Sequence, residues 1–370
     1  MDGGIAIGRV LGIRVYLHPT WFVVFFLVTI TLSSALGQEH AEWSGTLRTL
    51  LAGGTAALFF CAIFLHELGH SLLALRHGVG VRSITLFIFG GVAVMEKEPA
   101  TPRAEFEIAI AGPIVSALLA LAFTWLAGAA GADTPVGSML GWLSWINFIL
   151  AAFNLLPGFP LDGGRILRAL LWARSRDFQR ATRVAANVGQ WIAYGFIGLG
   201  AAQVLFYGNL VGGLWQAFIG WFLLSASGAT VRQAAIEHSL AGLLARDVMN
   251  PDVPRVQAGI SVGSFARDLV MRGRRWALVE EAGRTAGLIT LSDVKRVDPE
   301  QWETTPVGRV ATPIEAVVTA TPTQPVREVL TAIGAKNVNQ IPVVEDGTVL
   351  GAVTRDTLVR AIELRGGGLP

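Results

Sequence analysis

The stretch FLHELGHSLLAL, Phe64 to Leu75, carries two histidines and a glutamate inside a long apolar run. His66 and His70 are four residues apart, so on a helix they lie on one face and can bind the same ion. Glu67 lies one position beyond His66, where its carboxylate can act on a water held by that ion. This HExxH spacing predicts a zinc site with two imidazole ligands and a general base.

The apolar surroundings of the motif sharpen this prediction. Ionisable groups inside a membrane segment are costly, so three of them together indicate a functional site. The alternative is a buried polar cluster that only links helices through hydrogen bonds. Cys61, the single cysteine, lies shortly before His66. It could be a soft ligand, but a small apolar filler is its commoner role.

A catalytic zinc ion usually has three protein ligands and one open position for water. The candidate third ligand is Asp162, the only carboxylate in NLLPGFPLDGGRILRAL, Asn154 to Leu170. Prolines and glycines in this stretch break the helix, so the chain can turn back towards the histidines. Asn154 is a second polar residue there. The alternatives are a helix N-cap for Asp162 and an interhelical hydrogen bond for Asn154.

The elements that must position these residues are membrane helices. Only 15% of the 370 residues are charged, against about 25% in soluble proteins, and the mean hydropathy is +0.53. Runs of about 20 apolar residues predict spanning helices. Six candidate spans are present: Trp21–Leu36, Leu50–Leu75, Phe106–Gly131, Val136–Leu156, Ala185–Phe206 and Val211–Val231. We expect no cleavable signal peptide, because the first residues lack a basic start followed by an apolar stretch and a small-residue cleavage site.

The arginines and lysines predict the orientation of these spans. Basic residues gather at the N-terminus, in the second and fourth connections and after the last span, whereas Arg48 is alone on the other side. Both termini are therefore expected in the cytoplasm, with the chain in the inner membrane and in contact with lipid. Residues 238–370 carry equal numbers of basic and acidic residues, so no nucleic-acid partner is expected.

Taken together, HELGH at 66–70 and NLLPGFPLDGG at 154–164 resemble the site-2 proteases, a family of intramembrane zinc metalloproteases. Three further stretches fit: LHPTW at 17–21, FGGVAVM at 89–95 and EFEIAIAGPIVS at 105–116. The resemblance covers nearly all of residues 1–237. It implies one Zn²⁺ per chain held by His66, His70 and Asp162, with Glu67 activating the zinc-bound water. It also implies that Asn154 stabilises the oxyanion of the tetrahedral intermediate.

The resemblance implies a zinc-dependent endopeptidase that cuts single-span membrane proteins within or near the membrane, in regulated intramembrane proteolysis. Family substrates are anti-sigma-factor-like regulators or signal-peptide remnants. The alternative function is a catalytically silent zinc-containing scaffold. An intact Glu67 argues against it, because a scaffold needs ligands but no base. A transporter would spread ionisable groups along a path, whereas here they gather at one point.

The segment SITLFIFGGVAVM, Ser83 to Met95, is β-branched and aromatic around a Gly-Gly pair, and it predicts a membrane-associated β-hairpin. In the family, this region belongs to a membrane-associated sheet. We expect its edge to pair with an unwound substrate by strand addition. The alternative is a hairpin with only a structural role.

The C-terminal part contains a repeat, RDVMNPDVPRV to GLITLSDV and GRVATPIEAVV to GAVTRDTLVRA. It resembles a tandem pair of cystathionine-β-synthase (CBS) repeats, which implies an adenosine nucleotide (ATP or AMP) and a homodimer. Thr290 and Asp293 match the usual ribose-contacting pattern, and Thr354 matches it in the second copy, where Thr357 replaces the acidic residue. The alternative is a dimerisation module without a ligand.

The expected architecture is therefore a polytopic α-helical membrane protein with a soluble α/β tandem CBS domain. The protease domain is expected over residues 1–237, the first CBS repeat over 243–300 and the second over 305–365.

Overall fold

The computed structural model describes residues 4–88, 90–131, 134–271 and 274–365. The chain divides into two compact units, Met1–Arg232 and Gln233–Pro370. The first holds the long apolar helices and the second holds the repeat.

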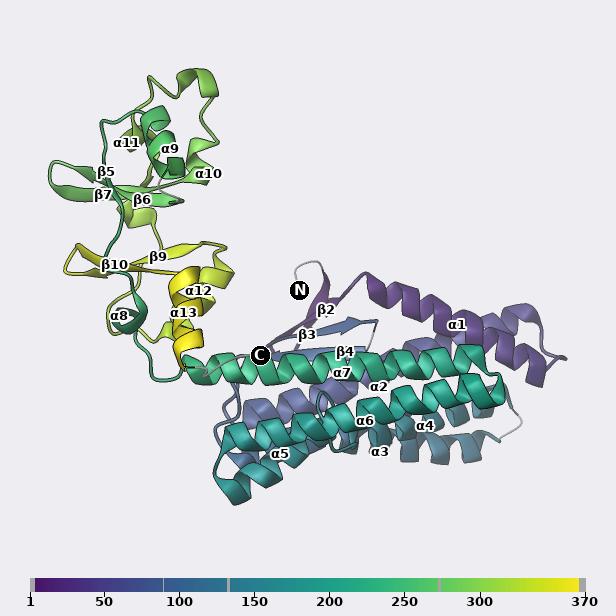
Figure 1. Ribbon diagram of the computed structural model, residues 1–370. Coiled ribbons are helices and arrows are strands. Elements are labelled where there is room, and N and C mark those ends of the chain that lie inside the picture. The colour runs from purple at the N-terminus through teal and green to yellow at the C-terminus, as the bar shows by residue number, and fades with distance from the viewer. Residues whose placement is uncertain (1–3, 89, 132–133, 272–273, 366–370) are drawn as a thin grey trace. The chain divides into compact units, whose positions relative to one another are not determined.

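Long helices running side by side make up most of the first unit (Figure 1). In the described part of the chain, six helices are long and apolar enough to cross a membrane, which confirms the predicted number of spans. They are α1 (Thr20–Glu39), α2 (Gly45–Arg76), α3 (Pro102–Ala130), α4 (Pro135–Asn154), α6 (Phe178–Tyr207) and α7 (Leu210–Ser239). Side-chain oxygens of Ser44, Thr101 and Thr134 cap the starts of α2, α3 and α4.

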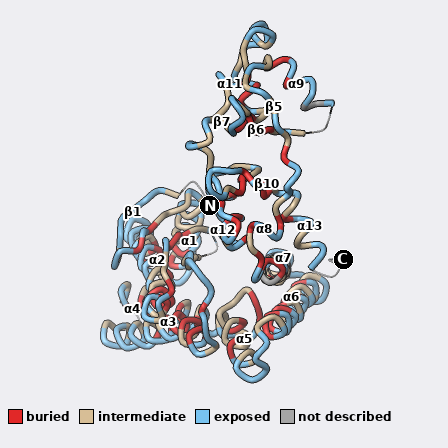
Figure 2. The backbone as a smooth tube through the Cα atoms, turned by 90° about the vertical axis from the view of Figure 1, so that its left-hand side faces the viewer, coloured by how far each residue is buried: buried red, intermediate tan, exposed pale blue. Residues whose placement is uncertain are grey.

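Many segments of these helices are exposed, as the pale blue parts of the tube in Figure 2 show, and large apolar side chains are among the exposed residues. Trp191 of α6 is 75% exposed, Leu205 is 77% exposed and Val211 of α7 is 81% exposed. Exposure of such an apolar surface to water is unfavourable, whereas contact with apolar lipid tails is not. The exposed apolar faces thus agree with a helix bundle surrounded by lipid.

A four-stranded sheet accompanies the helices, in the order β1-β2-β3-β4. The expected hairpin is present as β3 (Val81–Phe87) and β4 (Gly90–Met95), paired antiparallel; Phe89, which belongs to the quoted FGGVAVM stretch, lies outside the described residues. A second hairpin, β1 (Ile5–Val10) and β2 (Ile13–Leu17), was not predicted. It joins the sheet through parallel pairing of β2 with β3, which leaves β4 as one edge.

Between α4 and α6 the chain forms an irregular turn and the shorter helix α5 (Asp162–Ser175). Gly158 allows this turn to approach α6, because an added Cβ would clash with the backbone of Gly189. Helix α5 begins at Asp162 itself, directly after its N-cap residue Leu161. This start places Asp162 in the first turn of α5.

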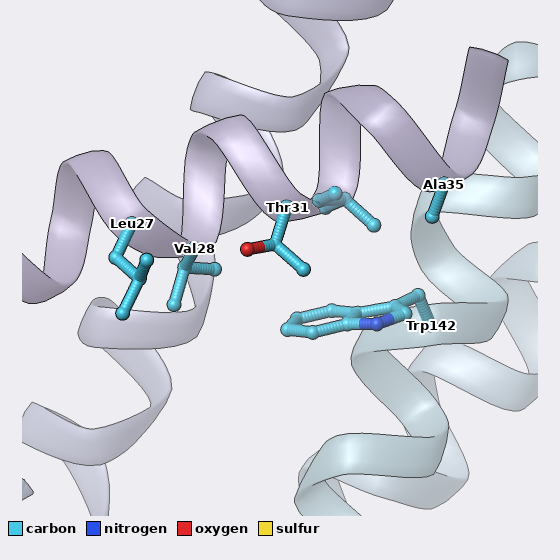
Figure 3. Close-up of a pocket in the computed structure, with 6 residues that line it drawn as sticks. Leu27, Val28, Thr31, Ala35 and Trp142 are labelled. Atoms are coloured by element: carbon cyan, nitrogen blue, oxygen red, sulfur yellow. The ribbon is translucent and has the colours of Figure 1, made fainter. Parts of the chain in front are cut away.

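An apolar groove of about 260 Å³ lies between α1 and α4 (Figure 3). Its walls come from α1 and from Trp142 of α4, and only Thr31 among its lining residues is polar. A groove with this lining suits an acyl chain or an apolar side chain and offers no group for catalysis. None of the candidate site residues lines it.

The second unit contains two similar α/β repeats. The elements of the first are α8 (Ala245–Val248), β5 (Arg255–Gln257), α9 (Val262–Met271), β6 (Trp276–Glu281), β7 (Arg284–Thr290), α10 (Leu291–Val294) and the 3₁₀ turn η1 (Pro299–Gln301). Those of the second are α11 (Val307–Val310), β8 (Thr312–Pro313), η2 (Ile314–Ala316), α12 (Val326–Ala335), β9 (Gln340–Glu345), β10 (Thr348–Thr354) and α13 (Arg355–Arg365). One buried cluster combines Leu278 and Leu288 of the first repeat with Val349 and Ala352 of the second, so the repeats share a core.

Candidate metal centre

Side chains from α2 and α5 converge at one point inside the first unit. The Nε2 atoms of His66 and His70 are 3.2 Å apart, and Oδ2 of Asp162 is 3.2 Å from the first and 3.1 Å from the second. Zinc–ligand bonds of about 2.0–2.1 Å place neighbouring atoms of a tetrahedron about 3.3 Å apart. Three ligand atoms at this spacing fit a zinc ion, and both histidines are 4% exposed.

The orientation of both imidazole rings is fixed by α3. Nδ1 of His70 is 2.7 Å from the backbone oxygen of Ile108, and Nδ1 of His66 is 2.9 Å from Oγ of Ser116. A carbonyl oxygen only accepts, so Nδ1 of His70 donates its hydrogen. Nε2 of a neutral His70 therefore presents a lone pair towards the Asp162 carboxylate. A metal ion placed between these facing acceptors would satisfy all of them, so this chemistry fits a metal ion.

Helix α3 also provides the space that these rings occupy. An added Cβ on Gly112 would clash with Nε2 of His70 and would lie 2.6 Å from Nε2 of His66. Gly112 is itself buried. Only a residue without a side chain lets α3 approach the face of α2 that carries the two histidines this closely.

The side chain of Glu67 extends from α2 towards the edge strand β4. The backbone amide of Ala93 in β4 interacts with its carboxylate. An added Cβ on Gly91 would clash with Cγ of Glu67, so the strand passes directly over this side chain. The candidate base is therefore next to the sheet edge that the hairpin was expected to offer.

The two candidate residues around the helix break have different environments. The Asp162 carboxylate turns to the histidines, and Leu161 rather than Asp162 is the N-cap of α5. The Asn154 amide donates to the Leu150 carbonyl in its own helix, 3.0 Å away, instead of bonding to another helix. Asn154 is half-buried at the end of α4. Its role in stabilising an oxyanion stays a prediction.

Sequence reasoning missed Ile108, Gly112 and Ser116 as parts of the site. These residues recur at intervals of four along EFEIAIAGPIVS, so they lie on one face of α3. From the sequence alone, this stretch is assigned only to the family resemblance. A small residue and a serine at this spacing were the available signal, and such pairs are common wherever membrane helices pack closely.

All three predicted nucleotide residues, Thr290, Asp293 and Thr354, take part in helix caps in the second unit. Oδ2 of Asp293 accepts from the backbone N–H of Thr290 at 2.9 Å and from its hydroxyl at 2.7 Å. In the second repeat, the hydroxyls of Thr354 and Thr357 accept from each other's backbone N–H groups. Thr357 thus makes the same cap as Asp293 without a charge. Both repeats thus have the same capped turn, and this cap explains the Thr290–Asp293 and Thr354–Thr357 contacts without a ligand.

Comparison with known proteins identifies relatives of both units. The family model described as peptidase family M50 matches residues 54–133 and 127–196, and the CBS domain model matches residues 245–300 and 307–364. The latter match confirms the CBS interpretation of the repeat.

Two relatives align with nearly the whole chain. "Putative zinc metalloprotease Rip3" of Mycobacterium tuberculosis is 36% identical over 98% of this chain and 94% of its own length. "Zinc metalloprotease MJ0392" of Methanocaldococcus jannaschii is 28% identical over 98% of this chain and 97% of its own. A solved structure, the site-2 protease from Methanocaldococcus jannaschii, is 30% identical with a TM-score of 0.42, covering 62% of this chain and 95% of that one.

Proposed function

This chain belongs to peptidase family M50, the site-2 protease family of zinc metalloproteases, and we propose that it hydrolyses peptide bonds within or near the membrane segment of single-span proteins. The convergence of His66, His70 and Asp162 beside Glu67 carries this proposal. A purely structural polar cluster has no need for three ligand atoms at zinc spacing, nor for a carboxylate next to them.

His66, His70 and Asp162 would hold the zinc ion. When bound, zinc supplies a Lewis acid that lowers the pKa of a water to about 7. Glu67 takes the proton of the attacking water and delivers it to the leaving amine. Asn154 donates a hydrogen bond to the oxyanion. The buried site keeps bulk water away from the reacting groups.

Strand β4 is the proposed docking edge for the substrate. A strand uses alternate N–H groups on its two sides. Because the Ala93 amide faces Glu67, the neighbouring amides of Val92 and Val94 face β3 instead. A substrate strand that adds along the free edge would therefore run beside the base. A helical substrate has no free backbone groups, so it must unwind before it pairs.

The substrate class that we propose comprises anti-sigma-factor-like regulators and signal-peptide remnants. Both are single apolar segments that remain in the bilayer. Six spans place both termini on one side, and the basic residues predict that this side is the cytoplasm. Arg168 does not contribute to this count, because it is buried in an ion pair. The remaining arginines still favour the same orientation.

The CBS pair is proposed to bind ATP or AMP near Thr290 and Asp293, to regulate cleavage and to form a homodimer. The match to two CBS domains supports this assignment. The second repeat lacks the carboxylate at Thr357, so one nucleotide site is favoured over two. The capping role of Asp293 supports the alternative, a dimerisation module without ligand.

Cleavage and zinc content, measured together in purified full-length protein, test the protease. We expect the wild type and Glu67→Gln to retain one zinc per chain and only the wild type to cut a generic single-span substrate. Glu107→Gln, a glutamate on α3 that bonds to Arg103 and His77, is the matched control and should still cut. Equal cutting by wild type and Glu67→Gln would refute the role of the base. Zinc in both with no cutting in either would favour the scaffold.

A further inference from the structure

A buried ion pair joins α5, which carries Asp162, to α3, which orients the two histidines. Nε of Arg168 donates to Oε1 of Glu105 at 2.6 Å. Glu105 is fully buried and Arg168 is 5% exposed. A second nitrogen of Arg168, an Nη atom, donates to Oε2 of Glu98, which lies before α3, at 3.2 Å.

The same guanidinium contacts the segments that lead into and out of α5. It lies 5.0 Å from the ring centre of Phe159, in the turn before α5, and 4.6 Å from that of Phe178, at the start of α6. Arg168 therefore contacts α3, the turn that precedes Asp162 and the helix that follows. The planar guanidinium permits ion pairing in its plane together with ring contacts on its faces, which a lysine cannot reproduce.

The position of this pair relative to the ligands gives it a mechanical role. Arg168 lies six residues after Asp162 on α5, about 9 Å along the helix. Glu105 lies seven residues before Gly112 on α3, about 10 Å along that helix. The pair thus fixes how far α5 can slide along α3, about two turns from the metal-binding atoms. Metal ligands must be held to within about 0.5 Å.

We propose that the Arg168–Glu105 pair positions Asp162 as the third zinc ligand. Without it, α5 retains its first turn but loses the register that brings Oδ2 of Asp162 to both histidines. Arg168 touches neither substrate nor metal, so it is a positioning residue. This inference rests on the metal site of the proposed function.

A double-mutant cycle in zinc affinity tests the proposal. Removing one buried charge alone would leave the other uncompensated, so the pair is neutralised together as Glu105→Gln with Arg168→Met. Zinc affinity of the full-length protein is measured by competition with a chelator, with and without Asp162→Ala. We expect the neutral pair to weaken zinc binding about tenfold or more when Asp162 is present, and less than about twofold when it is absent.

Equal losses of zinc affinity with and without Asp162 would overturn the proposal, because the ion pair would then affect the fold in general. No loss in either background would overturn it as well, because the pair would then have no effect on the metal site. If Asp162→Ala leaves zinc affinity unchanged, Asp162 is not a zinc ligand. The proposed metal site is then wrong, and so is the positioning role of the Arg168–Glu105 pair. The control neutralises the exposed pair on α3 as Arg103→Met with Glu107→Gln and should leave the affinity unchanged.

Arg168→Lys replaces the neutral pair if the latter does not fold. Lysine keeps the positive charge but lacks the planar guanidinium with its several N–H donors. We therefore expect a smaller loss of zinc affinity, which again occurs only when Asp162 is present. With Co²⁺ in place of zinc, the visible d–d bands report ligand geometry directly. Bands altered by Arg168→Lys support the positioning role, and bands identical to those of the wild type contradict it.

Discussion

The histidines of the candidate metal centre are oriented by a helix other than their own. Ile108 and Ser116 of α3 hold the two Nδ1 atoms, and Gly112 leaves room between them. Such outer partners fix the tautomer and the ring plane, and they commonly contribute 10- to 100-fold to metal affinity. The candidate metal site therefore depends on the α2–α3 contact as much as on the HExxH motif.

Gly112→Ala should weaken zinc binding about tenfold or more, because the new methyl group would occupy the space between the two Nε2 atoms. Zinc per chain after dialysis against a weak chelator measures the effect. Gly128→Ala is the control on the same helix, since a Cβ there has no neighbour within 4 Å. Full zinc retention by Gly112→Ala would show that α3 lies further from the histidines.

Residue types with strong chemistry were predictable from the sequence, and those without it were not. His66, Glu67 and His70 stand out because ionisable residues are rare and costly in an apolar helix. Asp162 was found as the only carboxylate near a helix break. Ser116 and Gly112 escaped notice, since small residues serve helix packing throughout membrane proteins. Their role depends on which helix lies beside α2, a tertiary fact that spacing along one helix does not contain.

Among the elements, the edge strand β4 brings the sheet to Glu67, the candidate base. It passes over Glu67 and presents the Ala93 amide to that side. The expected hairpin was recognisable from its β-branched residues. The partner hairpin β1–β2 was missed, because its turn places Leu11 beside Gly12 at positive φ, where hairpin sequences usually carry Asn or Asp before the glycine.

Ala93→Pro should slow cleavage about tenfold or more while zinc content stays unchanged. Proline removes the Ala93 N–H from the free edge, and with it the contact to Glu67, without touching the bonds to β3. Initial rates with a single-span substrate give the result. Ala93→Val keeps the amide, so it should cut nearly as fast as the wild type. If both variants are equally slow, side-chain bulk rather than strand pairing is responsible.

At the scale of the whole molecule, an even number of spans puts both ends of the chain on one side of the membrane. A reporter inserted at Gly208, between α6 and α7, should therefore read as non-cytoplasmic. Reporters at the two termini should read as cytoplasmic. A cytoplasmic signal at Gly208 would contradict the orientation that the arginines predict.

The CBS pair is expected to bind an adenosine nucleotide. Calorimetry on the full-length protein should detect binding of ATP or AMP, and Asp293→Asn should weaken it about tenfold, as expected for a lost charge-assisted hydrogen bond. Asp356→Asn, one residue before Thr357, is the matched control and should bind normally. An absence of heat with ATP, AMP and S-adenosylmethionine would favour a dimerisation module.

Zinc K-edge X-ray absorption of the purified full-length protein tests the central claim most directly, because it reports the ligands of the metal themselves. We expect four nitrogen or oxygen neighbours of zinc at about 2.0–2.1 Å, with outer-shell scattering from two imidazoles. Asp162→Ala should alter the first shell and leave both imidazoles. A sulfur neighbour at about 2.3 Å would instead indicate Cys61, and it would contradict the site, as would a spectrum without imidazole scattering.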